Sequence, residues 1–512
     1  MVVVMAGQPY GLVVIESQGV AFSVTNLQQL HELDRGFYPV AIGTDNFSDN
    51  FLSVETADAL QTALNTVLRV FKEYGVEDYT GFAGNVFFEA DNAEFVRDQL
   101  YNRTGVWLRQ LAVSEETYNR ANAVMQHFPQ FDQLANEGTL LIDIGGGTVE
   151  LMAFQRGKFC FARNLPLGPI RVVEDLKQVQ RTETNYVAVL RDYIDSELVN
   201  FLRLLPHAQD YKHLIIMGTG QHLLAKLLPA NDANREVLND LRTVYRSVIQ
   251  ASDQLLVDRY GLNNSELDQV LPTVLLEHEL VTSLQIRHVW TSSIDLLDGL
   301  AVNAAIDADS RAIKFDHTRI IRSSAMWLSD WYHVDRQHRN AVAGFALQLF
   351  DRLKSLHGLG KRERVLLETA AILADVGTYI DEQDVGVNNE YLIRATDVIG
   401  LSTHEQRMVA LVTHIYTSHK PGVYLSMDNG LRRAERVAAA KLASLLRIAD
   451  ALDASRRQKI SQIRVSLRSQ QLTITATSQD NVDLERWSFN TRSRFFESVF
   501  GVPVKFKWRK VQ

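Results

Sequence analysis

The sequence predicts an α/β protein whose second half is mainly helical, and three patterns support that fold class. An apolar strand, a small-residue turn and a second apolar strand occur at residues 10–25 and again at 138–154, each followed by helical sequence. From about residue 310 the chain changes to long amphipathic helices, and residues 460–477 alternate apolar and polar residues around a turn. We therefore expect a duplicated α/β unit, a helical region and a small C-terminal module that contains β-structure.

The spacing of apolar residues places the individual elements. It predicts helices at residues 56–75, 92–105, 185–205, 294–306, 339–360 and 432–453. Residues 213–220 read as a strand that runs into a glycine turn. The expected domains are residues 1–125, 126–308, 309–455 and 456–512.

Composition narrows the class of protein. The 512 residues are 46% hydrophobic, which is enough to build about two to four globular domains. The single cysteine, Cys160, excludes an intramolecular disulfide and a thiolate zinc site, so we expect a reducing compartment, the cytoplasm. The start lacks a basic signal-peptide segment, and no apolar run reaches the roughly 18 residues of a membrane span. Secretion and membrane insertion are not expected.

Charge is unevenly distributed along the chain. The net charge is −8, but the residues from Arg456 onward hold twelve Lys/Arg against four Asp/Glu. That C-terminal region therefore carries +8 and the remainder −16. A basic module on an acidic body indicates either a polyanionic partner or docking surface, or simply a solvated face.

The stretch "LLIDIGGGTVELMAF" at residues 140–154 is the strongest candidate site. Its glycines, Gly145, Gly146 and Gly147, leave backbone N–H groups open to a phosphate oxygen. Asp143 and Glu150 on either side supply the carboxylate oxygens that Mg²⁺ prefers. The alternative is a tight hairpin whose glycines serve only the turn. The spacing matches neither a Walker loop nor a dinucleotide fingerprint.

Four segments together resemble one family. "LIDIGGGTVEL" resembles the second phosphate loop of the exopolyphosphatase and guanosine pentaphosphate phosphohydrolase family, usually DIGGGSTE. Residues 103–117, 164–174 and 336–380 are similar to that family in order and spacing. The resemblance implies two actin-like, ribonuclease-H-type lobes (the sugar-kinase-like fold) and a helical domain of HD type. The family is commonly dimeric, so the resemblance also implies a homodimer. We expect no membrane and no specific nucleic acid as a partner.

Transfer of the family motifs assigns roles to residues of this chain. Glu116 in "LAVSEET" matches the glutamate that activates water. The phosphate-binding positions are Gly145, Gly146, Gly147, Thr148, Gly218, Thr219 and Gly220, and Asp143 and Glu150 match the Mg²⁺ ligands. His222 is as consistent with a buried helix-start histidine as with a substrate contact. The basic residues Arg456, Arg457, Lys505 and Lys507 are expected to guide a long polyanion.

The sequence also departs from the family pattern. The family's first turn reads DLGSN, whereas this chain has "VIESQGVAF", where only Glu16 and Ser17 offer a substitute. Phe87 or Phe88 stands where the family has a phosphate-binding arginine, and Leu297 replaces a second arginine. Because arginine grips phosphate through a planar fork that none of these side chains reproduces, we expect weaker binding of a highly charged substrate.

The helical region lacks part of the HD metal set. His338 matches its first histidine, but the central His-Asp pair reads Ala374-Asp375, and Asp450 or Asp453 completes the set. A further histidine cluster of the family reads "GVNNEY". An incomplete ligand set holds a metal poorly, so we expect no independent HD phosphohydrolase. Four histidines of this region are expected to be surface or core residues rather than ligands: His338, His357, His414 and His419.

Two functions follow from these features. The first is an Mg²⁺-dependent phosphohydrolase that removes terminal phosphate from inorganic polyphosphate or from guanosine pentaphosphate. The second is a non-catalytic protein that binds polyphosphate or an alarmone and signals through its helical domain.

Overall fold

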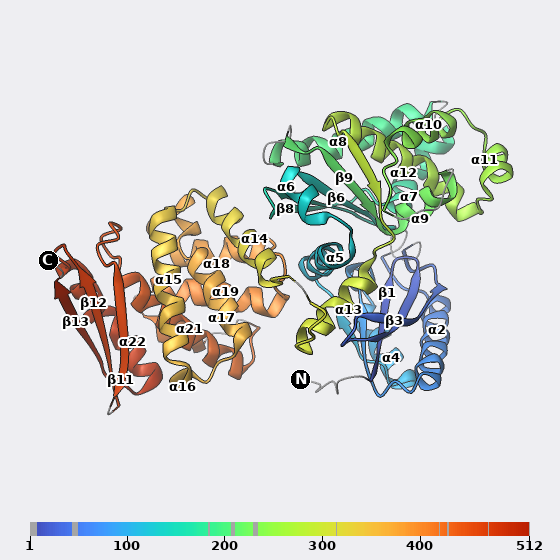
Figure 1. Cartoon of the computed structure of the whole chain (residues 1–512). Coiled ribbons are helices and arrows are strands. Elements are labelled where there is room, and N and C mark those ends of the chain that lie inside the picture. The colour runs from blue at the N-terminus through green and yellow to red at the C-terminus, as the bar shows by residue number, and fades with distance from the viewer. Residues whose placement is uncertain are drawn as a thin grey trace. The chain divides into compact units, whose positions relative to one another are not determined.

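The computed structural model of the chain divides into two compact units, Met1–His317 and Thr318–Gln512, which are described separately (Figure 1). The expected boundary after residue 308 falls at the end of α13 (Leu296–Asp307), and the first unit continues to His317. The structure describes residues 8–43, 50–182, 185–205, 210–228, 234–313, 315–418, 420–426, 430–468 and 470–510.

The first unit contains two five-stranded sheets built on one plan. The strand order is β3-β2-β1-β4-β5 in one sheet and β8-β7-β6-β9-β10 in the other. In each, an antiparallel three-stranded meander is extended by two parallel strands. The predicted repeat of a hairpin is confirmed. The strands are β1 (Pro9–Glu16), β2 (Gly19–Asn26), β3 (His31–Pro39), β4 (Asp78–Ala83), β5 (Leu108–Gln110), β6 (Thr139–Ile144), β7 (Val149–Gln155), β8 (Lys158–Leu165), β9 (His213–Met217) and β10 (His288–Thr291).

Both faces of the first sheet are covered. Val13 and Ile15 of β1 point into a core with α2, while Leu12 and Val14 point into a second core with α13. A strand that is buried on both faces reads as a continuous apolar run, which explains "LVVI". The helices of this unit are α2 (Val54–Glu73), α3 (Asn85–Phe88), α4 (Ala93–Thr104), α5 (Val113–His127), α6 (Phe131–Glu137), α7 (Pro169–Thr182), α8 (Tyr186–Leu204), α9 (Gly218–Leu227), α10 (Leu238–Val248), α11 (Asp253–Tyr260), α12 (Asn264–Ser283) and α13.

Helices α5 and α13 lie side by side (Figure 1). Gly299 of α13 stands against the backbone of Asn119 in α5, where an added Cβ would collide with the Asn119 carbonyl. Leu297 and Leu300 of α13 are buried beside β1. Glycine at this crossing therefore lets α13 hold α5 close to the first sheet.

The second unit is helical with a small β-containing module, as predicted. The helix expected at residues 339–360 is broken at Leu353 into two helices, α15 and α16. The helices are α14 (Thr318–Trp331), α15 (Arg336–Arg352), α16 (Lys354–His357), α17 (Lys361–Ile372), η2 (Val376–Tyr379), α18 (Val385–Ala395), α19 (Thr403–Thr417), α20 (Pro421–Ser426), α21 (Arg433–Ala451) and α22 (Asp483–Phe500). None of the described helices combines the length and apolar character needed to cross a bilayer.

The C-terminal module is a three-stranded sheet with one covering helix. The predicted hairpin forms β11 (Gln462–Arg468) and β12 (Gln471–Ser478), and the chain continues through α22 to β13 (Val504–Lys510), which pairs parallel with β12. Leu472, Ile474 and Ala476 are buried, and Phe506 packs against Phe489 of α22 with ring centroids 5.2 Å apart. One face of the sheet is therefore apolar and covered by α22.

Candidate functional site

The predicted base, Glu116, lies in the first turn of α5. Its Oε1 accepts a hydrogen bond from the backbone N–H of Asn85 at 3.2 Å, and a Cβ on Gly84 would stand only 3.1 Å from that oxygen. The adjacent Glu115 turns elsewhere, accepting from the Ala112 N–H at 3.2 Å and from Arg109 at 2.8 Å. The two neighbouring glutamates therefore have separate environments.

A buried arginine, Arg120, gathers four carboxylates from different elements. It lies one turn after Glu116 on α5 and is 8% exposed. Its Nη1 is 3.1 Å from Glu116 and 3.7 Å from Glu150, its Nη2 is 3.7 Å from Glu16, and its Nε pairs with Asp143. No sequence motif points to Arg120, although its spacing of four residues from Glu116 places the two side chains on one face of the helix.

Burial shifts the ionisation of two of these acids. Although 39% of the Glu16 side chain is exposed, desolvation raises its pKa to about 7, against the effect of Arg120 and with that of Asp295. Burial likewise raises the pKa of Asp143, and the Arg120 guanidinium opposes that shift. The cluster thus holds carboxylates that are costly to ionise and one cation that compensates them.

The second hairpin turn, residues 145–148, is anchored through its carbonyl groups. The Gly146 carbonyl accepts from the N–H groups of Ile170 and Arg171 at the start of α7, at 2.9 and 3.3 Å. The Gly145 N–H donates to Thr148. The N–H groups of Gly146 and Gly147 have no acceptor among the described residues. These two glycines keep the donors that a phosphate oxygen would use.

The two hairpin turns of the first unit meet. A Cβ on Gly146 would stand 2.6 Å from the Ser17 hydroxyl of the first turn and 2.8 Å from Ile170. A larger side chain at residue 146 would separate the turns. The first turn, which departs from the family pattern, therefore places Ser17 directly against Gly146 of the second turn.

The glycine turn after β9 is the start of α9. Gly218 has φ +76° and stands so close to Asp143 that any Cβ would collide with its carboxylate. Gly220 packs on Ile144, where a Cβ would lie 2.7 Å from the side chain. Thr219 belongs to the same helix, and its side chain is outside the described atoms. Gly218 thus permits the approach of β9 and α9 to Asp143.

A cavity of about 550 Å³ opens beside the turns. The Gln18 amide donates to Gln269 of α12 across it at 3.2 Å. Among its described lining residues the one acid is Glu266, which pairs with Lys226 at 2.5 Å. No Lys or Arg is among the described lining residues, which include Ser17, Gln18, Gly145, Gly220, His222, Asn263, Glu266, Gln269 and Thr273.

The arrangement of Asp143 and Glu150 does not fit a divalent cation while Arg120 pairs with both. Glu150 also accepts a hydrogen bond from the Thr117 hydroxyl. Within the described ranges, no group of three or more His, Cys, Asp or Glu side chains is arranged to hold a metal ion. The predicted Mg²⁺ ligands come together, but around a guanidinium.

The positions where the resemblance implies arginines hold packing residues. Phe87 is fully buried in the core between α2 and the first sheet, Phe88 is partly buried against it, and Leu297 is 3% exposed in the core with α13. Near Phe87, Arg171 pairs with Glu89 at 2.9 Å. Phe87, Phe88 and Leu297 therefore serve packing and offer no polar group to a phosphate.

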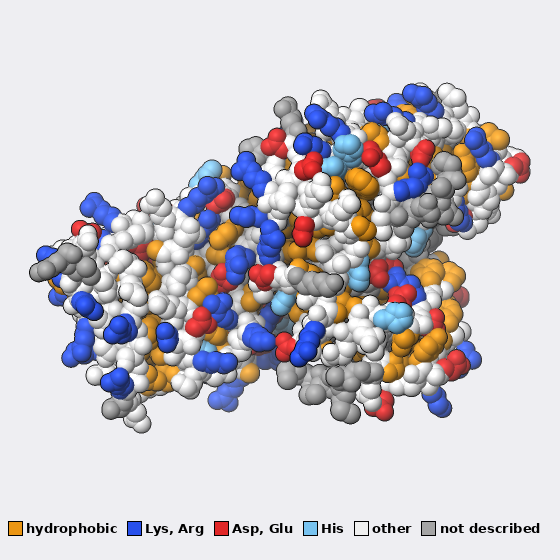
Figure 2. All heavy atoms as spheres, in the orientation of Figure 1, with side chains coloured by type: hydrophobic (Ala, Val, Ile, Leu, Met, Phe, Trp, Pro, Cys, Tyr) orange, Lys and Arg blue, Asp and Glu red, His pale blue; other side chains and the backbone are white. Residues whose placement is uncertain are grey.

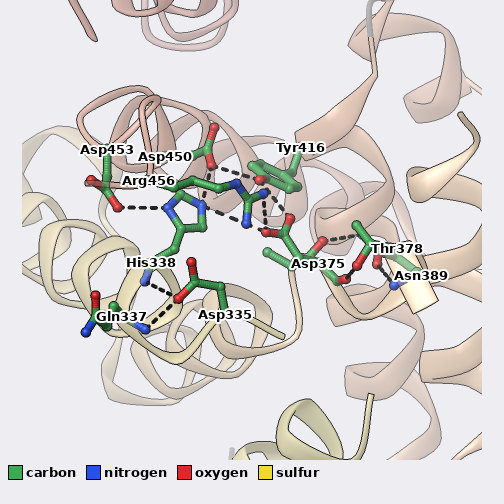
Figure 3. A network of polar contacts seen from close by, with 12 residues as sticks. Asp335, Gln337, His338, Asp375, Thr378, Asn389, Tyr416, Asp450, Asp453 and Arg456 are labelled. Atoms are coloured by element: carbon green, nitrogen blue, oxygen red, sulfur yellow. Dashed lines mark hydrogen bonds and ion pairs between the residues drawn. The ribbon is translucent and has the colours of Figure 1, made fainter. Parts of the chain in front are cut away.

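The predicted remnants of the HD set form one polar network in the second unit (Figure 3). His338 Nδ1 is 2.9 Å from Asp453 and its Nε2 is 3.1 Å from Asp450. Asp375 accepts from Arg456 at 2.7 Å, and the Tyr416 hydroxyl lies 2.8 Å from Asp450 and 3.1 Å from Asp375. Arg492 also pairs with Asp450, at 2.5 Å. Three carboxylates thus face one histidine and two arginines.

Arg456 and His338 belong to this network, whereas His357 and His414 have partners elsewhere. Arg456, predicted to guide a polyanion, directs its guanidinium to Asp375 instead of presenting all its donors to solvent. His357 is buried between the Phe350 carbonyl and the Leu359 N–H, and His414 lies 2.6 Å from Glu390. His419 lies outside the described residues.

Two of the residues predicted to guide a polyanion, Lys505 and Lys507, lie on the open face of the C-terminal sheet. Across β11, β12 and β13, Arg464 stands opposite Thr475 and Thr475 opposite Lys507. The three strands carry no Asp or Glu. The exposed cations of this basic sheet face are Arg464, Arg468, Lys505, Lys507 and Arg509, and Arg457 is exposed nearby. Figure 2 shows blue side chains gathered over this part of the surface.

The two sheets, the meeting hairpin turns and the carboxylate cluster lie in a chain that two family models match over most of its length. The family model described as "Ppx/GppA phosphatase family" matches residues 21–306, and "Ppx/GppA phosphatase, domain III" matches residues 320–492. The chain belongs to the Ppx/GppA phosphatase family.

The chain is similar to exopolyphosphatases and to guanosine-5'-triphosphate,3'-diphosphate pyrophosphatases. The chain is 25% identical over 307 residues to Exopolyphosphatase 1 of Mycobacterium leprae, covering 58% of this chain and 86% of that protein. It is 22% identical over 325 residues to a guanosine-5'-triphosphate,3'-diphosphate pyrophosphatase of Pseudoalteromonas translucida, covering 60% of each. The crystal structure of an exopolyphosphatase from Cytophaga hutchinsonii shares the fold with TM-score 0.50 and 14% identity, over 60% of this chain and 100% of that one.

Gly218→Ala should destabilise the first unit more than a matched glycine substitution. Gly75→Ala is the control, because Gly75 also has positive φ, +66°, but no atom lies within 4 Å of its added Cβ. The backbone term alone costs about 1 kcal/mol, and displacing Asp143 should raise the loss at Gly218 to about 2 kcal/mol or more. Urea denaturation of both variants measures the difference, and equal losses would contradict the predicted collision.

The second unit should lose stability as pH rises from about 6.5 through about 9. Burial alone would lower the pKa of His338, but its hydrogen bonds to Asp450 and Asp453 raise it to about 9. A histidine whose pKa is higher in the folded than in the unfolded state stabilises the fold fully at pH values below its unfolded-state pKa. This stabilisation is lost as the pH rises above its folded-state pKa. The free energy of unfolding should fall by at most roughly 3 kcal/mol over this pH range.

His338→Gln should remove this pH dependence from the free energy of unfolding, measured by urea denaturation across that range. The exposed His404→Gln is the control and should keep the wild-type profile. A His338→Gln profile as steep as that of the wild type would rule out this origin.

Proposed function

We propose that this protein is a phosphohydrolase that removes a terminal phosphoryl group from inorganic polyphosphate or guanosine pentaphosphate. The observation that carries the proposal is the position of Glu116 with Asp143 and Glu150 in one cluster, beside the two hairpin turns. The names of the exopolyphosphatase and pyrophosphatase relatives support the same reaction class. Within this proposal the two sheets are actin-like lobes and the helical part is of HD type.

In this proposal the residues of the chain position the attacking water and the phosphate group. Glu116 would orient a water for in-line attack on the terminal phosphorus, because its carboxylate is fixed by Asn85 and Arg120 and 18% of its side chain stays exposed. The N–H groups of Gly146 and Gly147 would bind phosphate oxygens. The reaction breaks the anhydride bond and leaves inorganic phosphate and the shortened chain. Mg²⁺ enters the proposal as the counter-ion carried by the phosphate chain itself.

A second candidate is a non-catalytic protein that binds polyphosphate or an alarmone. Two observations favour it: Arg120 pairs with the predicted base and with both predicted metal ligands, and no described cavity-lining residue is Lys or Arg. The proposal also keeps a homodimer, which the family resemblance implied, and a cytoplasmic location, which the single cysteine favours. Phosphate release distinguishes the two functions directly.

Glu116→Gln should lower the rate of phosphate release from long-chain polyphosphate by about 100-fold or more, because an amide cannot take the proton of the attacking water. Glu115→Gln is the matched control: it is the adjacent glutamate, paired with Arg109 outside the cluster, and should keep most of the activity. Each is assayed with Mg²⁺ present, in parallel with guanosine pentaphosphate.

A wild-type protein that retains polyphosphate on a filter but releases no phosphate would establish the binding function instead. Release that is equal in wild type and Glu116→Gln would show that another group activates the water.

The double substitution Lys505→Ala/Lys507→Ala should weaken binding of long polyphosphate and reduce its salt dependence. If both lysines contact phosphates, the slope of log affinity against log salt should become shallower by roughly 1 to 1.5. Arg352→Ala/Lys354→Ala, two exposed cations of the same unit outside the basic sheet face, is the control. Equal slopes for the two double variants would remove the basic sheet face from the binding site.

A further inference from the structure

The carboxylate cluster brings together more negative charge than a partly buried site tolerates without a cation. Glu16 ends β1, Glu116 lies on α5, Asp143 lies on β6 and Glu150 lies on β7. Asp143 and Glu150 are 5% and 6% exposed. Like charges at this spacing repel strongly where water is excluded, so the arrangement needs a compensating cation at its centre.

Arg120 lies at that centre and uses all three of its nitrogens. Nε faces Asp143, Nη1 faces Glu116 and Glu150, and Nη2 faces Glu16. Among the described residues no other Lys or Arg pairs with Glu16, Glu116 or Asp143. A guanidinium keeps its charge at every ordinary pH and distributes five donors in a plane, which suits several carboxylates at once.

A divalent cation would require a different arrangement of the same oxygens. Mg²⁺ needs oxygen ligands at about 2.0–2.1 Å in near-octahedral geometry. Here the Asp143 and Glu150 oxygens are directed to Arg120 and to the Thr117 hydroxyl. The guanidinium therefore occupies the space between the acids that an ion would need.

We propose that Arg120 is a built-in cation that takes the place of a divalent metal in this cluster, so that Asp143 and Glu150 bind no Mg²⁺ in the wild-type chain. Removal of the guanidinium would leave uncompensated carboxylates and create a divalent-cation site. The inference concerns the residues of the proposed active site, but it holds or fails independently of turnover.

Mn²⁺, a paramagnetic substitute for Mg²⁺, tests the proposal by titration calorimetry and by the loss of its free-ion EPR signal, without phosphate present. The wild type and the single variant Asp143→Asn should bind Mn²⁺ equally weakly. Arg120→Met should bind at least about tenfold more tightly, the order of effect expected from removing one like charge at about 4 Å. Adding Asp143→Asn to Arg120→Met should abolish that gain.

Arg109→Met is the matched control, because it removes an exposed arginine that pairs with Glu115 near the start of the same helix. It should leave Mn²⁺ binding at the wild-type level. A folded Arg120→Met protein, checked by circular dichroism, that gains no Mn²⁺ affinity would overturn the proposal.

The wild-type titration decides the question even if Arg120→Met does not fold. Stoichiometric Mn²⁺ binding that Asp143→Asn removes would overturn the proposal, whereas weak binding that Asp143→Asn leaves unchanged supports it. Phosphate release by the wild type is scored separately, so loss of the proposed hydrolase activity and loss of this inference give different results.

Discussion

The first unit depends on the ionic contacts of one buried side chain, Arg120. Its guanidinium faces carboxylates from β1, α5, β6 and β7, so it links both sheets to the helix that carries Glu116. A buried charge that lost these partners would be costly, as would the acids without it. The geometry of the site is thus fixed by mutual neutralisation rather than by any single hydrogen bond.

Small residues make this convergence possible at three places. Gly299 lets α13 press on α5, Gly146 lets the two hairpin turns meet, and Gly218 leaves room for the Asp143 carboxylate. At each place the neighbour of the missing Cβ is a backbone or polar atom of another element. These glycines therefore serve tertiary approach more than local turn geometry, which is why a turn-only interpretation of the "GGG" stretch was incomplete.

The sequence predicted what local patterns encode and missed what tertiary proximity creates. The repeated hairpins, the long helices and the strand before Gly218 follow from periodicity and turn residues, and they are present. The burial of Arg120 could not be predicted, because an arginine four residues after a glutamate is typical of a solvated helix face. Its partners Glu16, Asp143 and Glu150 lie on β1, β6 and β7, far from it in the sequence. The C-terminal hairpin was found, but not its parallel third strand, since β13 pairs with β12 only after α22 intervenes.

The second unit contains a comparable cluster of buried acids and cations. Asp375 and Asp450 pair with Arg456 and Arg492. His338 adds a further positive charge, because, against the lowering effect of burial, its hydrogen bonds to Asp450 and Asp453 raise its pKa to about 9. Residue 374 is an alanine and offers no side-chain ligand, and the buried carboxylates of Asp375 and Asp450 need positive charge. In both units arginine supplies that charge covalently. The two clusters therefore solve the same electrostatic problem, that of buried acids, with guanidinium groups that also link separate elements of the fold.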